Sequence, residues 1–288
     1  MKMWMDARRE DVLDAPYFHL VFTVPDILNP IIYNNQKLLY DILYHAASAT
    51  ISELTADPKH LGADVGYICI LHTWGSEMNF HPHIHTILLG GGLTSKNEWK
   101  DNGTEFFLPI RAVSKSFRGK YIDELKHLWN TGQLEFHGTA EKYRNYYVFK
   151  DLLDSCYDTE WIPYCKKTFN GAGSVIDYLG KYTHRIAISN HRTICMDDEN
   201  VTFSLKDYRN KGQWKELTLS GVEFIRRFLM HVPPKRFVRI RHYGLLCSRS
   251  KHKKLTLCRN LLGCQKYLSK LRGKEMPEIL KQDRKSVV

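Results

Sequence analysis

Two strand-like runs near the centre of the sequence constrain the fold more than any other feature. They are residues 65–74, VGYICILHTW, and residues 81–89, HPHIHTILL, and both are rich in β-branched and aromatic side chains. A short polar link joins them. Such a link can connect antiparallel strands but cannot hold a crossover helix, so the two runs are expected to pair as a hairpin. The glycines that follow, residues 90–92, are expected to form the turn that ends the second strand.

The rest of the sequence mixes strands with helices. Strand-like runs outnumber the helices that could serve as crossovers, so we predict an α+β fold with a central, mainly antiparallel sheet flanked by helices. Further strands are expected at residues 17–25, 105–110, 161–167, 201–207 and 236–244. Helices are expected at residues 35–54, 114–129, 141–157 and 220–232, and from Val175, where Ser174 and Asp177 resemble a capping box.

Basic residues are concentrated in the last quarter of the chain. From Phe224 to the end there are 18 Lys and Arg residues against 3 Asp and Glu, a net charge of +15, whereas residues 1–223 carry 24 against 28, a net charge of −4. A charge this one-sided favours contact with nucleic acid. We divide the chain into a short N-terminal segment (1–15), a main domain (16–196) and a basic C-terminal region (197–288) that is expected to contact DNA.

Several classes of protein are disfavoured by what the sequence lacks. No run is apolar for long enough to span a bilayer and no signal-peptide core is present, so we expect a cytoplasmic protein without a membrane partner. The seven cysteines include no C-x-x-C pair, and the string Cys247, His252, Cys258 and Cys264 matches no common zinc finger. Glycine-rich fingerprints of dinucleotide or ATP sites are also missing, so no nucleotide cofactor is expected.

The second strand of the hairpin carries a candidate metal site. Side chains at alternate positions of a strand share a face, so His81, His83 and His85 point the same way, and neutral imidazoles are common ligands of divalent cations. His83 and His85 lie well inside the strand, whereas His81 lies at its entry. His72, at the end of the preceding strand, could supply a third ligand across the pair, with Glu77 and His81 as weaker alternatives.

A second constellation is the motif YLGKY at residues 178–182. Tyr178 and Tyr182 are four residues apart on the expected helix, so both hydroxyls would lie on one face. Packing alone could explain such a pair. A phenol becomes a good nucleophile when a nearby cation stabilises its ionised form, and Lys181 could supply that charge.

Three motifs in this order, VFTVP, LHTWGSEMNFHPHIHTILLGGGLT and YLGKYTHRIAISNHR, resemble those of HUH endonucleases, in which U is a hydrophobic residue. In particular, the chain resembles the two-tyrosine transposases of rolling-circle insertion sequences of the IS91 type, and residues 207–246 are similar to the C-terminal segment of that family. The resemblance extends from Pro16 to Leu246. Members usually carry an N-terminal cysteine-rich zinc-binding module, which this chain is expected to lack.

The resemblance implies a ferredoxin-like or RRM-like palm and a transposase activity. His83, His85 and a third ligand, His72, would hold one Mg²⁺ or Mn²⁺ at the scissile phosphate of single-stranded DNA. Tyr178 or Tyr182 would then attack, which leaves a 5′-phosphotyrosine and a free 3′-OH, so strand transfer would need no ATP.

The resemblance also suggests the partners of the protein. Single-stranded DNA at the element ends and at the target would be the substrate, in the nucleoid, and a host helicase could unwind the duplex because the sequence has no helicase motif. Lys181 and Arg185 could contact phosphates or could be ordinary solvated charges. Phe237 and Tyr243 could stack on bases, although core packing is the simpler role. His19 is expected to be structural.

Two other interpretations stay open. A replication initiator or relaxase would use the same chemistry, and the paired tyrosines together with the C-terminal segment favour the transposase over it. Alternatively, the chain could be a non-catalytic DNA-binding remnant of a transposase.

Overall fold

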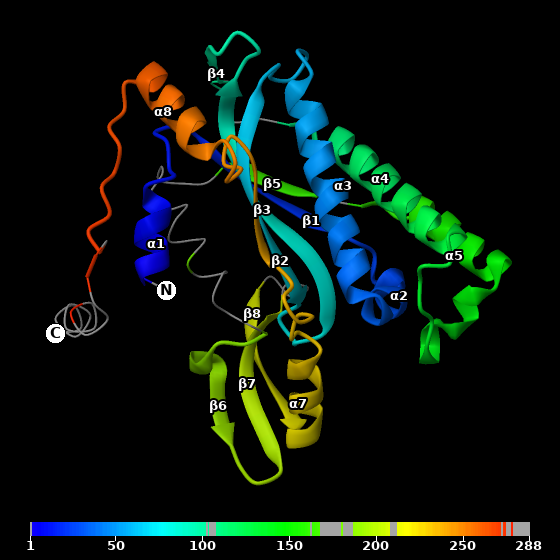
Figure 1. Cartoon of the computed structure of the whole chain (residues 1–288). Helices are drawn as coiled ribbons and strands as arrows, with labels where there is room; N and C mark the ends of the chain where they lie inside the picture. The colour runs from blue at the N-terminus through cyan, green and yellow to red at the C-terminus, as the bar shows by residue number, and fades with distance from the viewer. Residues whose placement is uncertain are drawn as a thin grey trace.

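A six-stranded antiparallel sheet forms the centre of the protein (Figure 1). The computed structural model describes residues 2–101, 103, 108–161, 163–167, 180, 187–207, 212–271, 273–274 and 278. The strands follow the order β5-β1-β3-β2-β9, and β4 pairs with β3. The expected hairpin and the α+β class are both confirmed. The strands are β1 (Tyr17–Thr23), β2 (Asp64–Trp74), β3 (Phe80–Leu93), β4 (Trp99–Asp101), β5 (Tyr164–Lys167) and β9 (Ile240–Gly244).

Helices cover both faces of this sheet (Figure 1). None of the helices in the described part of the chain is long and apolar enough to cross a bilayer. One face is covered by α2 (Asn29–Asn34), α3 (Gln36–Ala56), α4 (Ile110–Asn130) and α5 (Tyr146–Asp158), with short 3-10 turns at Asp26–Leu28 and Gly138–Arg144. The other face is covered in part by α1 (Lys2–Arg9) and α8 (Lys251–Leu262).

Strict alternation along β1 separates the two faces. Phe18, Leu20 and Phe22 are almost completely buried in the core beneath α3 and α4, and we call this the helix face. Tyr17 and His19 occupy the alternate positions of the strand and therefore point to the opposite face. That opposite face also carries the histidines of β2 and β3, and we call it the histidine face.

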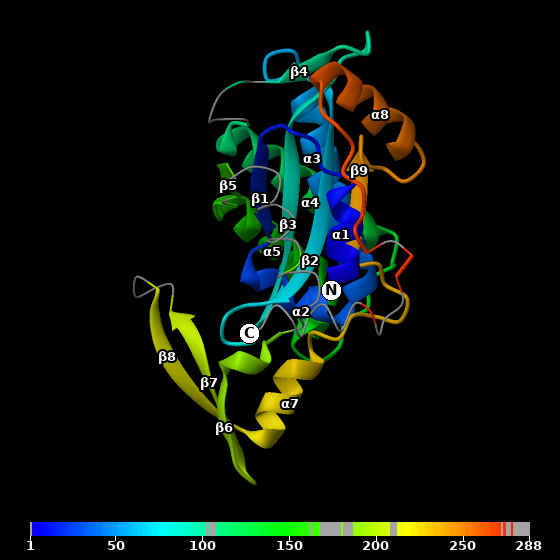
Figure 2. The same cartoon turned by 90° about the vertical axis from the view of Figure 1, so that its left-hand side faces the viewer.

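A second, three-stranded sheet lies beyond one end of the central sheet (Figure 2). Its inner side is apolar, because Phe203 and Leu205 are buried and pack with Phe224 and Phe228 of the adjoining helix. The elements are β6 (Thr193–Met196), β7 (Asn200–Asp207), β8 (Gln213–Ser220) and α7 (Gly221–Leu229), with a 3-10 turn at Asn190–Arg192.

The turn between β2 and β3 anchors the second sheet to the central one. Met78, in this turn, is 0% exposed and belongs to the core of the second sheet. Backbone carbonyls of the same turn accept hydrogen bonds from Arg192 (to Ser76, 2.6 Å) and Arg227 (to Glu77, 3.0 Å). The two sheets therefore meet at the end of the hairpin.

The expectation that residues 90–92 form a turn is wrong. All three glycines lie inside β3, which continues to Leu93. A Cβ atom on Gly90 would lie 2.7 Å from the ring of Phe18, and one on Gly92 would collide with the carbonyl oxygen of Asp64. Glycine is required here because neighbouring backbone and side chains approach closely, and not because the chain reverses.

Several other helices and strands differ from the expectations or cannot be compared with them. Helices α1 and α8 and strand β8 were not predicted, since their segments are short or highly charged. Apart from Gly180, the expected helix from Val175 lies outside the described residues, as do residues 105–107 of the expected strand at 105–110, and α4 already begins at Ile110. Strand β9 pairs with β2, so a part of the proposed C-terminal region completes the central sheet. The division at residue 196 stays a prediction.

The C-terminal segment is tied to helix α1 through one carboxylate. Asp6 is buried and accepts hydrogen bonds from the Tyr267 hydroxyl (2.7 Å), the Ser269 hydroxyl and the Leu271 backbone N–H (2.9 Å). Burial alone would raise the pKa of Asp6, but these hydrogen bonds outweigh it and hold the pKa below its usual range. The ionised carboxylate thus joins the two ends of the described chain.

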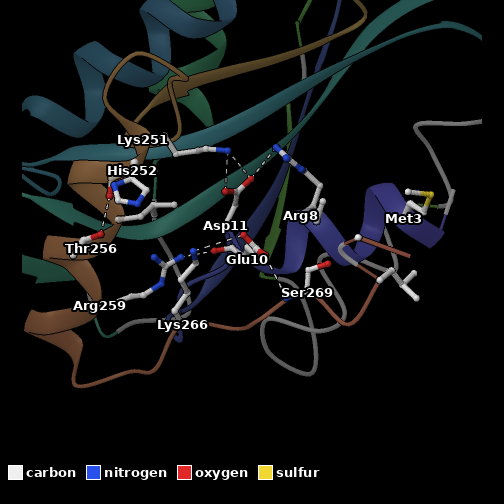
Figure 3. A pocket seen from close by; sticks show the side chains of 14 residues that line it. Met3, Arg8, Glu10, Asp11, Lys251, His252, Thr256, Arg259, Lys266 and Ser269 are labelled. Carbon is white, nitrogen blue, oxygen red and sulfur yellow. Dashed lines mark hydrogen bonds and ion pairs between the residues drawn. The ribbon is translucent and has the colours of Figure 1, made fainter. Parts of the chain in front are cut away.

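Ion pairs extend this contact to α8. In a cavity of about 440 Å³ between α1 and α8, Asp11 lies between Arg8 (2.8 Å) and Lys251 (2.9 Å), as Figure 3 shows. Arg259 of α8 also donates to the backbone carbonyl of Glu10. The first and last helices are therefore held together by charge as well as by apolar packing on the histidine face.

Replacing Asp6 should weaken the fold in a pH-dependent way. We expect Asp6→Ala to lower the free energy of unfolding by about 2 kcal/mol at pH 7, because three partly buried donors lose a charged acceptor. The folded-state pKa is lowered, so this stability is present above the unfolded pKa and is lost as the pH falls through the folded value. Urea unfolding at pH 7 and below pH 4 measures it, with the exposed Asp14→Ala as control. Equal losses in both variants, or a loss that does not shrink in acid, would contradict the assignment.

Candidate metal centre

The β2–β3 pairing brings three histidines together on one face of the central sheet. His72 lies directly opposite His83 in the antiparallel register, and His85 lies two residues further along β3. Side chains opposite each other, or two apart on one strand, share a face. His72 therefore contacts both histidines of β3, with ring centroids 5.5 Å from His83 directly opposite and 4.4 Å from His85 on the diagonal.

The three imidazoles are close enough to share one cation. One ring nitrogen of each lies within 4.8 Å of the other two. The Nε2 atoms of His83 and His85 are 3.1 Å apart, and the ring of His72 lies 4.4 Å from that of His85 between centroids. Among the described residues, this is the group of His, Cys, Asp and Glu side chains with metal-ligand spacing.

The other nitrogen of each β3 imidazole is held by a partner. His83 Nδ1 lies 2.7 Å from the carbonyl oxygen of His81, which can only accept, so the proton of neutral His83 is on Nδ1 and its Nε2 carries a lone pair. His85 Nδ1 lies 2.8 Å from Nε2 of His19. The Nε2 of His85 also carries a lone pair in the tautomer in which Nδ1 donates to His19.

Burial keeps these rings neutral. Burial lowers the pKa of His83 to about 4 and that of His19 to about 4, and the backbone hydrogen bond of His83 offsets only a part of the effect. Burial, with the nearby His72, His83 and His19, also lowers the pKa of His85 well below its usual value. Neutral imidazole is the form that binds metals, so the cluster is in its ligand form at pH 7.

Aromatic rings support His72 from the side away from β3. Its ring stacks on Trp74 with 4.6 Å between centroids, and the guanidinium of Arg239 lies 5.5 Å from the centroid of Trp74. His231 packs against Trp74 and its ring lies 3.2 Å from the hydroxyl of Thr73. With 3% of its surface exposed, His72 is the most buried member of the cluster.

His81 and Glu77, the weaker candidates for the third metal ligand, lie outside the cluster. His81 Nδ1 is 3.1 Å from a carboxylate oxygen of Asp26, so its ring is directed to that residue. Glu77 is exposed in the turn. Among the described residues, the group with metal-ligand spacing contains no member of the zinc string, and burial raises the pKa of the Cys258 thiol to about 11.

The predicted nucleophiles and phosphate contacts, Tyr178, Tyr182, Lys181 and Arg185, lie outside the described residues. Gly180, between the two tyrosines in sequence, is described and buried. A Cβ atom at Gly180 would lie 2.5 Å from the sulfur of Met5 in α1, a helix that packs on the histidine face. Gly180 therefore lies on the side of the sheet that carries the histidine cluster.

His19 is the site residue whose contact the sequence interpretation missed. It was expected to be structural, yet its ring stacks on His85 with 5.1 Å between centroids and bonds to it. The alternation of β1 already places His19 opposite the helix face. His19 lies beside the cluster because of the β1–β3 register, in which Val21 is opposite His85. That register could not be derived from the sequence.

Comparison with known proteins agrees with this geometry. The Y2_Tnp family model, described as "Putative transposase", matches residues 66–254. "Putative transposase y4qJ" of Sinorhizobium fredii (strain NBRC 101917 / NGR234) is 41% identical over 90% of this chain and 66% of its own length. The "Transposase for insertion sequence element IS801" of Pseudomonas savastanoi pv. phaseolicola is 31% identical over 85% of this chain and 58% of its own length. The chain thus spans less than two thirds of either relative.

Two solved structures show a partial likeness. The metal-bound conjugative relaxase TrwC in complex with oriT DNA is 14% identical, with a TM-score of 0.32 over 39% of this chain and 44% of that chain. The metal-free TrwC complex with oriT DNA is 13% identical, with a TM-score of 0.27 over 59% of this chain and 73% of that chain.

The match to the family model covers more than half of the chain. It includes the β2–β3 hairpin with its three histidines and the YLGKY segment. The chain therefore belongs to the Y2_Tnp family of transposases, which is the IS91-type family.

Proposed function

We propose that the protein is a metal-dependent endonuclease and strand transferase for single-stranded DNA, acting in rolling-circle transposition. The observation that carries this proposal is the cluster of His72, His83 and His85, three imidazoles that bring one ring nitrogen each to within 4.8 Å of the other two, in a chain of a transposase family. In the tautomer in which the Nε2 lone pairs of His83 and His85 face each other, no hydrogen bond joins these two atoms, and a bound cation explains the arrangement better.

The donor set indicates which cation fits. In the tautomer in which His85 donates to His19, two Nε2 lone pairs face each other at 3.1 Å, an arrangement that repels unless a positive charge lies between them. All three donors are imidazole nitrogens. Mg²⁺ strongly prefers oxygen ligands, whereas imidazole suits transition metals, so of the two expected cations Mn²⁺ fits better. Such a cation would polarise the scissile phosphate and neutralise its developing charge.

We assign the covalent step to the tyrosines Tyr178 and Tyr182. The phenolate oxygen of Tyr178 or Tyr182 attacks the scissile phosphorus, a bond forms between that oxygen and the 5′-phosphate, and the bond from phosphorus to the 3′-oxygen breaks. The leaving 3′-oxygen takes up a proton and becomes a free 3′-OH. Lys181 would stabilise the phenolate. Because the phosphotyrosine is again a diester, a 3′-OH can reverse the step at another site, which is strand transfer without ATP.

Residues outside the histidine cluster are assigned to DNA binding. We assign Lys181, Arg185 and the basic C-terminal region to the phosphate backbone. A partner helicase or supercoiling would expose the single strand in the nucleoid. Phe237 and Tyr243 do not fit the stacking role, because Tyr243 stacks on Tyr67 and both aromatics pack against the core on the helix face.

His83→Ala and His85→Ala should each weaken Mn²⁺ binding by more than about 100-fold, because loss of a direct ligand costs more than loss of an outer partner. His72→Ala should have a comparable effect. Titration of Mn²⁺ followed by electron paramagnetic resonance measures the affinity without reference to activity. The matched control is His81→Ala, on the same strand but bonded to Asp26. If His81→Ala costs as much as His83→Ala, or if His83→Ala binds Mn²⁺ normally, the cluster is not the metal site.

The tyrosines are tested by trapping the covalent product. Incubation of the protein with Mn²⁺ and single-stranded DNA carrying an element end should give a protein–DNA adduct that survives denaturation. The Tyr178→Phe, Tyr182→Phe double variant should give none, since phenylalanine keeps the ring and removes the attacking oxygen. An adduct formed by the double variant would place the nucleophile elsewhere. No adduct from wild-type protein on any end would favour the non-catalytic remnant.

His19 is assigned a positioning role, as the acceptor that fixes His85 with its Nε2 toward the cation. We expect His19→Ala to weaken Mn²⁺ binding about 10-fold, as is usual for loss of an outer hydrogen bond. His19→Gln should restore most of the affinity, because its amide oxygen can accept from Nδ1 of His85. Thermal unfolding separates this from a general loss of stability. Equal affinity in all three proteins would leave His19 a structural residue.

A further inference from the structure

The second sheet has an outer face that its own core does not use. Its inner side packs on α7 and Met78, as described above. Side chains at alternate positions point away from that core. The outer face consists of Thr202, Ser204 and Lys206 of β7 and Thr218, Glu216 and Trp214 of β8, which pair in that order across the two strands.

Trp214 stands out on this face. Its surface is 62% exposed, although tryptophan gains more than any other side chain from burial. Lys206 lies directly opposite in the register, and its ammonium is 5.4 Å from the centroid of the indole ring. An exposed indole next to a cation is the combination with which proteins stack on a base and neutralise the neighbouring phosphate.

The surroundings of Trp214 are polar, which argues against a protein partner. The hydroxyls of Thr202 and Thr218 lie 2.8 Å apart across the strands, and Ser204 and Glu216 lie between them and the Lys206–Trp214 pair. The core of a protein interface is usually apolar and depleted of charge. Hydroxyls and a carboxylate beside one exposed ring instead suit the edges of unpaired bases, which offer amino donors and ring acceptors.

The outer face is held at a fixed place relative to the metal cluster. The second sheet is anchored to the β2–β3 turn by Met78, and His231 Nε2 lies 3.0 Å from the carbonyl oxygen of Met78. His72 and His83 lie on the two strands that enter and leave this turn. Figure 2 shows the end of the β7–β8 hairpin, where Lys206 and Trp214 pair, projecting to the side of the central sheet on which β1 and β5 lie.

We propose that the outer face binds the single-stranded DNA that flanks the scissile phosphate. Trp214 stacks on one base, and Lys206 contacts the adjacent phosphate. This inference rests on the proposed function for the identity of the ligand, but it concerns a surface made of other residues than the histidine cluster. Binding to this face is sequence-tolerant, because every base presents a ring to stack on.

The first test measures affinity for a fluorescein-labelled oligonucleotide by anisotropy, with the full chain and without added metal. We expect Trp214→Ala to weaken binding of single-stranded DNA about 10-fold, in line with the usual effect of removing one stacking ring, and Trp214→Phe to weaken it less. The matched control is Tyr147→Ala, which removes an aromatic residue of α5 that is 74% exposed. Tyr147→Ala should bind as the wild type does, and a fully duplex oligonucleotide should not distinguish the variants.

A second measurement locates the contact. Oligonucleotides carrying 5-bromodeoxyuridine should photo-crosslink to the peptide that contains Trp214, and the crosslink should be lost in Trp214→Ala. Thermal unfolding should be unchanged, because the side chain is exposed. Crosslinks confined to other peptides would overturn the inference, as would unaltered affinity of Trp214→Ala for single-stranded DNA.

The outcomes separate this inference from the proposed chemistry. If Trp214→Ala binds DNA normally while the wild type still forms the covalent adduct, the outer face is not the contact and the proposed function stands. If Trp214→Ala loses affinity but the wild type forms no adduct, the outer face binds DNA and the covalent chemistry fails. A change in self-association of Trp214→Ala on gel filtration, with unaltered DNA affinity, would make the outer face a protein interface and overturn the inference.

Discussion

The register of the β2–β3 hairpin is the constraint on which the rest of the structure depends. With His72 opposite His83, both side chains fall on the histidine face together with His85. A slip of one residue would turn His72 toward the buried core under α3 and leave the cluster with two ligands. The flanking strands secure this register from both sides, since β1 pairs along β3 and β9 pairs along β2. The histidines are therefore positioned by the backbone hydrogen bonds of the six-stranded sheet and not by a flexible loop.

Burying the histidines costs free energy. This cost explains why the hydrogen bonds at the nitrogens that face away from the cluster matter. A buried imidazole resists protonation, and three of them within one site would repel each other if more than one were charged. Burial lowers the pKa of His83 and of His85, so these two rings are neutral at pH 7. In the neutral state each ring can offer a lone pair from only one nitrogen, so the contact at the other nitrogen decides its direction. The carbonyl of His81 does this for His83, and His19 can do it for His85. Burial and outer contacts together prepare the cluster for a cation.

The sequence predicted the part of the site that depends on local periodicity. Alternation in β3 placed His81, His83 and His85 on one face, the position of His81 at the strand entry made it a weaker candidate, and the short link predicted the hairpin. It could not predict which residue of β1 lies beside His85, because the β1–β3 register depends on the whole sheet. The glycines 90–92 show a different limit: glycine marks both chain reversals and close approach, and only the collision with Asp64 in three dimensions distinguishes them. Helix α8 was missed although Leu255, Cys258 and Leu262 follow helical spacing, because lysines dominate its first turn.

The turn at Met78 links the second sheet, with its proposed DNA contact, to the histidine cluster. Its backbone has φ +57°, a left-handed conformation that costs a non-glycine residue roughly 1–2 kcal/mol. Full burial of a methionine side chain contributes roughly 1.5–3 kcal/mol, and Met78 is fully buried in the core of the second sheet. The turn thus keeps its conformation because the second sheet is docked on it, and the second sheet is docked because the turn presents Met78. A displacement of the second sheet, which carries Trp214, therefore acts on the end of the hairpin that carries His72 and His83. This contact would couple the DNA strand proposed for the outer face to the proposed metal ligands.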